Sequence, residues 1–320
     1  MGTRLKGKNQ IAVFRRVAEK LVLKIIVHKN VAGVIFLGGL IRNFVDRFSD
    51  LDIIVLLSGP DQRSVMQIHG LAMEEKRAST VDVDLEIHLL GDFKKRKWDE
   101  TDRWDFSKCK IAFDPREEIR KMLEAKLMVP RDFWIRRIAV CGEYVKWYCC
   151  PPKHSVGTIA EAWIERGDLT AAHYSLNYAV DLLLKVVFAF NKEFLPPPKW
   201  RVFCSYDLKW LPKNYKELLG EMMNVRDISA RDFNRRLKAI RKMWGEILPK
   251  IQDETGLTSD QMSKYYVKKM LRQDFAPSTE SMTGARYGLW PFGFEVHNSL
   301  ITGCNFQNET DRSIAIILTP

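Results

Sequence analysis

The sequence predicts an α+β protein in which a mixed β-sheet with flanking helices is followed by an α-helical bundle. Short apolar runs of strand length lie within the first ninety residues, and helical periodicities dominate the chain from there to about residue 250. A Cys-Cys-Pro-Pro-Lys-His-Ser segment at 149–155 interrupts the helical patterns. We therefore expect one domain over 1–150, a helical domain over 151–275 and a tail over 276–320, to which no fold is assigned.

The first predicted strand is the apolar run 34–37, which ends at a pair of glycines, Gly38 and Gly39. A buried strand that turns sharply into a helix has this pattern, and the helix is expected to start near Leu40. Glycines present backbone N–H groups without a Cβ in the way, and the helix start adds further unpaired donors. The turn is therefore a candidate phosphate site.

The second predicted strand, 51–57, is entered through the sequence Asp50-Leu51-Asp52. Residues two apart in a strand project from the same face, so the two carboxylates can hold the same metal ions. Two divalent cations bound between carboxylates and triphosphate oxygens are the arrangement used for in-line displacement at phosphorus. Asp50 and Asp52 are therefore candidate catalytic residues and candidate magnesium ligands.

The third predicted strand lies within 81–90 and alternates strictly between apolar and polar side chains. Its acids repel one another unless a cation or several donors lie opposite, which favours a position beside a metal. Asp84 and Glu86 lie mid-strand, so either is a candidate for the third carboxylate or for the general base that takes the acceptor proton. The polar face consists of Asp82, Asp84, Glu86 and His88.

An apolar residue, two glycines, a spacer of ten residues and an Asp-x-Asp resemble the motif of nucleotidyltransferases of the DNA polymerase beta superfamily. Within that superfamily the chain looks most similar to kanamycin- and lincosamide-type small-molecule enzymes. Their appended HEPN-like helical domain resembles the region from 168 to 200, including its Pro-Pro-Pro-Lys-Trp ending. The residues that meet the motif are Leu37, Gly38, Gly39, Asp50 and Asp52.

This resemblance implies that Gly38 and Gly39 cradle a triphosphate, that Asp50 and Asp52 bind two Mg²⁺ ions, and that Asp84 or Glu86 completes the set. The implied reaction transfers a nucleoside monophosphate, expected to be AMP from ATP, to a hydroxyl of a small-molecule acceptor such as an antibiotic. Pyrophosphate is released. The alternatives are a protein or RNA acceptor, or a non-catalytic nucleotide-binding protein. A homodimer is compatible with each of them.

The rest of the chain is predicted to be mainly helical, because apolar residues recur at helical spacing. Three prolines before Trp200 predict a stiff extended turn. In the tail, 286–294 is aromatic and glycine-rich, and 313–318 has the pattern of a short edge strand. The predicted helices cover 115–127, 131–147, 155–166, 168–192 and 230–248.

The composition is that of an ordinary globular protein, with 46% hydrophobic and 28% charged residues among 320. The most apolar stretch, 178–190, is interrupted by Asp181 and Lys185 and is too short to cross a bilayer. The start of the chain lacks a signal-type apolar core, so we expect a cytoplasmic protein. Six cysteines without a C-x-x-C pair predict neither a zinc site nor a disulfide framework.

The net charge of +11 raises the question of a nucleic-acid partner, because a basic surface concentrates polyanions. The basic residues are spread along the chain, and those of the helix 230–248 lie opposite its apolar stripe, as on a solvated face. No RNA-binding signature with interleaved aromatics is present. Nucleic acid is therefore the less favoured partner, after a nucleoside triphosphate and a small molecule.

Overall fold

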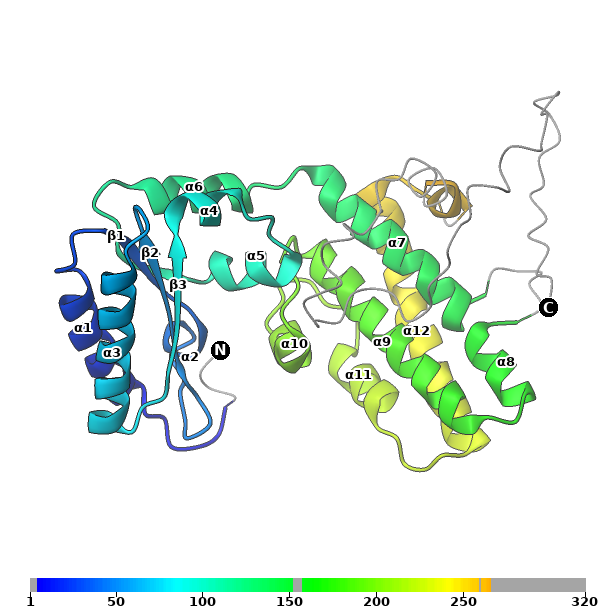
Figure 1. Ribbon diagram of the computed structural model, residues 1–320. Coiled ribbons are helices and arrows are strands. Elements are labelled where there is room, and N and C mark those ends of the chain that lie inside the picture. The colour runs from blue at the N-terminus through cyan, green and yellow to red at the C-terminus, as the bar shows by residue number, and fades with distance from the viewer. Residues whose placement is uncertain (1–4, 152–156, 259, 266–320) are drawn as a thin grey trace, which may run out of the picture. The chain divides into compact units, whose positions relative to one another are not determined.

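A computed structural model describes residues 5–151, 157–258 and 260–265 of the chain (Figure 1). The predicted tail over 276–320 lies outside the described residues, as do the aromatic segment 286–294 and the predicted edge strand 313–318. The prediction of an α+β fold is confirmed, since a four-stranded mixed sheet and many helices make up the described chain. No described helix is long and apolar enough to span a membrane.

The sheet has the strand order β3-β2-β1-β4. Strand β1 pairs antiparallel with both β2 and β4, whereas β2 and β3 run parallel. A parallel pair needs a crossover, which the long helix α3 supplies between β2 and β3. The strands are β1 (Val31–Phe36), β2 (Leu51–Leu57), β3 (Val83–Leu89) and β4 (Lys110–Phe113).

Six helices accompany the sheet. Helices α1 and α3 cover one face of the sheet (Figure 1). On that face Phe14 and Leu21 of α1 belong to the same buried apolar cluster as Leu51 and Ile53 of β2. The other face packs against α4, α5 and α6 through a second apolar cluster that includes Ile54. The helices are α1 (Ile11–Ile25), α2 (Gly38–Ile41), α3 (Gln62–Ser79), α4 (Leu90–Lys95), α5 (Glu100–Ser107) and α6 (Glu118–Leu127).

The remaining helices form a bundle around α9, which is apolar on most of its circumference and is therefore buried on most sides. The predicted helices over 131–147, 155–166, 168–192 and 230–248 are found as α7, α8, α9 and α12. Two helices of the bundle, α10 and α11, were not predicted. Pro197 is extended, as expected of the proline turn, and α10 begins directly after it at Pro198. The bundle consists of α7 (Arg131–Cys149), α8 (Ile159–Glu165), α9 (Leu169–Phe190), α10 (Pro198–Ser205), α11 (Tyr215–Met223) and α12 (Ala230–Thr255).

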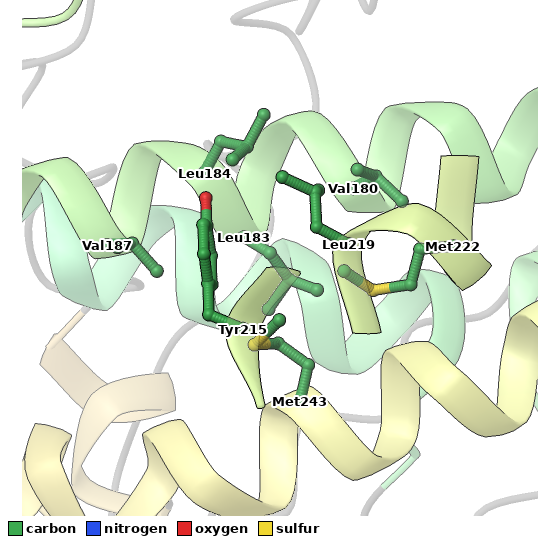
Figure 2. A pocket seen from close by; sticks show the side chains of 8 residues that line it. All are labelled: Val180, Leu183, Leu184, Val187, Tyr215, Leu219, Met222 and Met243. Carbon is green, nitrogen blue, oxygen red and sulfur yellow. The ribbon is translucent and has the colours of Figure 1, made fainter. Parts of the chain in front are cut away.

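Helix α7 packs with the bundle, because Ile138 and Val145 are buried in the same apolar cluster as the core of α9. The division near residue 150 stays a prediction, and this packing assigns α7 to its helical side. Within the bundle, apolar side chains of α9, α11 and α12 pack against one another in a closed core without space for a water molecule (Figure 2). Its members are Val180, Leu183, Leu184, Val187, Tyr215, Leu219, Met222 and Met243.

A fully buried arginine, Arg236, ties three bundle helices together. Its Nε donates to the carbonyl of Met222 at 2.8 Å, and Nη1 lies 2.9 Å from Nδ1 of His173. Its Nη2 donates to the side-chain oxygen of Asn177. A buried charge is tolerated where its donors are paired, so this network fixes how α12 sits against α9 and α11.

Candidate functional site

Three carboxylates lie close together at the N-terminal ends of the adjacent parallel strands β2 and β3. Asp52 and Asp84 are register partners, and Asp50 immediately precedes β2. Oxygen atoms of Asp50, Asp52 and Asp84 lie within 4.8 Å of one another. Side chains of directly paired residues project from the same face of a sheet, so the register itself brings Asp84 to the Asp-x-Asp pair.

The electrostatics of this cluster favour a cation. The pKa of Asp52 is raised to about 6, mainly by burial and then by the charges of Asp50 and Asp84, while Arg42 opposes the shift. Burial and the charges of Asp50, Glu86 and Asp82 also raise the pKa of Asp84. Three clustered oxygen donors of one charge sign suit a hard divalent ion such as Mg²⁺. The residues present therefore fit a magnesium site.

The other polar residues of the predicted strand face are Asp82, which precedes β3, and Glu86 and His88 of β3, and none of them joins the cluster. Lys76 pairs with Asp82 at 2.6 Å. Nε2 of His88 lies 2.8 Å from a carboxylate oxygen of Glu86. Glu86 is the register partner of Ile54, one pleat beyond the Asp-x-Asp pair. Of the two predicted candidates for the third carboxylate, the structure brings Asp84 to the site and leaves Glu86 outside it.

Gly38 lies against the carboxylate cluster and has a left-handed backbone, with φ of +64°. A methyl group at this position would overlap Oδ2 of Asp52, so only glycine lets the turn approach so closely. A Cβ on Gly39 would lie 2.7 Å from Cγ1 of Val45, so this glycine is required by packing. Helix α2 begins at Gly38, two residues before the predicted start, and lasts a single turn.

The loop between α2 and β2 is fixed by its own hydrogen bonds. Asp46 accepts from the backbone N–H of Phe48 and from the hydroxyl of Ser49, each at 3.0 Å. The side chain of Asn43, in a left-handed conformation, accepts from Arg15 of α1 at 2.6 Å. These contacts hold the backbone that leads into Asp50, so the position of Asp50 does not depend on its own side-chain bonds.

Arg42 was not singled out from the sequence, although it lies within the spacer of the motif. The charges of Asp52, Asp105 and Asp50 act to raise the pKa of Arg42, but burial of the guanidinium lowers it. The guanidinium also lies over two indole rings, with Cζ 4.4 Å from the centroid of Trp200 and 5.8 Å from that of Trp104. Sequence spacing gives no signal for this residue, because its neighbours come from α5 and α10, far along the chain.

Asp105 of α5 is a second acid that the sequence did not indicate. Burial raises its pKa to about 6, and the charges of Arg42 and Lys199 oppose that rise. The negative charge of Asp105 also helps to raise the pKa of Asp52. A further acid, on helix α5 beside the sheet, therefore lies near the carboxylate cluster and Arg42.

Comparisons with known proteins give matches among solved structures only; no family model and no curated protein matches this chain. A nucleotidyltransferase-like protein from Exiguobacterium sibiricum 255-15 is 8% identical, with 75% of this chain and 77% of that chain covered and a TM-score of 0.39. Spectinomycin adenyltransferase AAD(9) from Enterococcus faecialis, with ATP and spectinomycin, is 14% identical, with 72% and 98% covered and a TM-score of 0.26.

A third similar structure is a complex of a tri-AMPylated HEPN toxin from Shewanella oneidensis with an MNT antitoxin. It is 16% identical, with 42% of this chain and 98% of that chain covered and a TM-score of 0.26. At these sequence identities and TM-scores, the similar structures do not indicate what this chain does. The functional argument rests on its own carboxylates and glycine turn.

Proposed function

We propose that this protein is a metal-dependent nucleotidyltransferase that moves a nucleoside monophosphate, AMP from ATP, onto a hydroxyl of a small-molecule acceptor such as an antibiotic. The observation that carries the proposal is the convergence of Asp50, Asp52 and Asp84 within 4.8 Å, beside a glycine turn that tolerates no side chain. Oxygen ligands for divalent ions next to bare backbone are what a triphosphate and its metal ions require.

In this proposal Asp50, Asp52 and Asp84 hold Mg²⁺, expected as two ions. Bound there, the ions would polarise the phosphoryl group and neutralise charge on the entering and leaving oxygens. The Gly38 backbone lies directly against the Asp52 carboxylate, so a phosphate bound at this turn would lie beside the same metal ligands. Arg42 adds a positive charge that interacts with Asp50 and Asp52, where it would also attract an anionic substrate.

The chemistry is a displacement at the α-phosphorus. The acceptor oxygen bonds to phosphorus, the bond from phosphorus to the bridging oxygen breaks, and pyrophosphate leaves with the electron pair. Asp84 is exposed, and we assign it as the group that takes the hydroxyl proton. Glu86, paired with His88, has no role in this scheme.

The helical part, with α7 included, would form the acceptor side, because Trp200 of α10 borders the cluster through Arg42. Trp104 and Asp105 of α5, a helix that packs on the sheet, lie beside the same arginine. The domains proposed from the sequence, 1–150, 151–275 and 276–320, would then divide the work between the nucleotide and its acceptor. A homodimer remains part of the proposal for the assembled enzyme.

The test is magnesium-dependent release of pyrophosphate from each ribonucleoside triphosphate, against aminoglycosides, lincosamides, simple polyols, short RNA and a protein acceptor. Asp52→Asn should abolish release, whereas Glu86→Gln, a matched carboxyl-to-amide change on β3, should keep it. Release with a small molecule supports the proposal, and release with RNA or protein alone changes its acceptor. Nucleotide binding without turnover on any acceptor would move this protein to the non-catalytic class.

A further inference from the structure

Arg42 lies over the rings of two tryptophans from different helices. Its Cζ lies 4.4 Å from the ring centroid of Trp200 in α10 and 5.8 Å from that of Trp104 in α5. We call Arg42, Trp104 and Trp200 the arginine clamp. A guanidinium stacks well on indole faces, and such contacts contribute most where water is partly excluded. The clamp joins the glycine turn of the sheet to the helices beside it.

Contacts with the bundle fix the helices that carry the two indoles. Helix α5 is tied to the bundle by Glu100, which pairs with Arg137 and accepts from the backbone N–H of Leu195 at 3.1 Å. Helix α10 starts with Pro198 at its first position, so its first turn, which contains Trp200, has a fixed entry. Arg201 then ties this turn to Asp181 of α9. The position of Trp200 is therefore set by the bundle and not by Arg42.

One hydrogen-bond donor of the Arg42 guanidinium, its buried Nε, has no acceptor among the described residues. The charge of Arg42 interacts with those of Asp52, Asp105 and Asp50. A partly buried cation with an unpaired donor beside a carboxylate cluster is suited to an additional anionic group that brings its own oxygen acceptors.

We propose that Trp200 is a positioning residue that holds Arg42 for the phosphates of a nucleoside triphosphate at the carboxylate cluster. The inference rests on the proposed function and goes beyond it, because it makes the affinity of the sheet for nucleotide depend on a side chain of the helical bundle. Trp200 itself acts through Arg42.

The experiment measures the affinity for a magnesium complex of α,β-methylene ATP by calorimetry, in the full-length protein. Trp200→Leu should weaken binding about fivefold to tenfold, and Trp200→Phe, which keeps an aromatic face, should stay within about twofold of wild type. Trp163→Leu is the matched control, because Trp163 of α8 carries a similar stack, with Arg166 at 5.0 Å. It should leave the affinity unchanged.

A double-mutant cycle separates positioning from general structural damage. In the Arg42→Ala background, Trp200→Leu should cause no further loss of affinity. Should Trp200→Leu fail to fold, Arg42→Lys tests the same contact from the other side, since an ammonium keeps the charge but loses the planar stack. It should lose affinity to a similar extent.

Additive losses in the cycle, or wild-type affinity in Trp200→Leu and in Arg42→Lys, overturn the inference while nucleotide binding by the wild type leaves the proposed function standing. A wild-type protein that binds no nucleotide in the presence of magnesium overturns the proposed function, and the inference falls with it.

Discussion

Replacing Asp52 with asparagine removes one charge from the carboxylate cluster and keeps nearly the same side-chain volume. The pKa of Asp52 rises from 3.8 to about 6 in the folded protein, mainly because of burial and then because of Asp50. At about 1.4 kcal/mol per pKa unit, its ionisation costs the metal-free folded state up to about 3 kcal/mol. A neutral asparagine side chain carries no such cost, so the variant should be the more stable protein at neutral pH when a chelator is present.

The pH dependence gives the sign of the effect. A carboxyl whose pKa is higher in the folded state keeps its proton there at a pH where the unfolded chain has lost it. The difference between wild type and Asp52→Asn should therefore be full above about pH 6, fall between about pH 6 and pH 4, and vanish below that range. Added magnesium should reverse the order near pH 7.5, because it binds the wild-type cluster more tightly and stabilises it by mass action.

The assay is urea unfolding followed by far-UV circular dichroism, at about pH 7.5 and about pH 4, with chelator or with magnesium. Glu86→Gln is the control. It removes a charge from an exposed position on the same strand, and it should change the free energy of unfolding by less than about 0.5 kcal/mol. An Asp52→Asn protein that is no more stable than wild type at pH 7.5 with chelator would refute the argument that clustered carboxylates strain this site.

Three further results are expected. Gly38→Ala should lower pyrophosphate release by ~100-fold, because the new methyl displaces a carboxylate of the cluster, whereas Gly59→Ala, with no atom within 4 Å of the new Cβ, should be neutral in both activity and stability. Asp84→Asn should reduce magnesium-dependent turnover by ~100-fold while Glu86→Gln stays near wild type; the reverse result would give Glu86 the role of third carboxylate. Arg236→Met should lower the free energy of unfolding by about 3 kcal/mol, measured by urea titration, because it leaves several buried acceptors without a donor; a change under about 1 kcal/mol would show that water replaces the guanidinium.

Local patterns predicted most of the secondary structure that positions the site. The apolar runs around β1 and β2 and the alternation in β3 were sufficient, because burial of one or both faces of a strand leaves its mark on neighbouring residues. Helix α9 was predicted nearly to its ends for the same reason. Helix α10 was missed, because three prolines in a row favour an extended turn as readily as a helix start.

Local sequence patterns could not decide which residue is the third carboxylate of the cluster. Asp84 and Glu86 lie on the same face of one strand, and nothing in the strand itself separates them. The parallel register with β2 sets Asp84 beside Asp52 and Glu86 beside Ile54. Register depends on how two strands and the helix between them pack, so the choice was made by the tertiary structure.

The sequence by itself determined the α+β class, the glycine turn, and the pairing of Asp50 with Asp52, since these features lie within one short stretch whose spacing and backbone chemistry fix their geometry. The tertiary structure alone decided that Asp84 joins them and that Arg42 lies over the rings of Trp104 and Trp200. The physical reason is that the first group depends on bonds along the chain. The second depends on distances between elements, which only the packing of helices on the sheet sets.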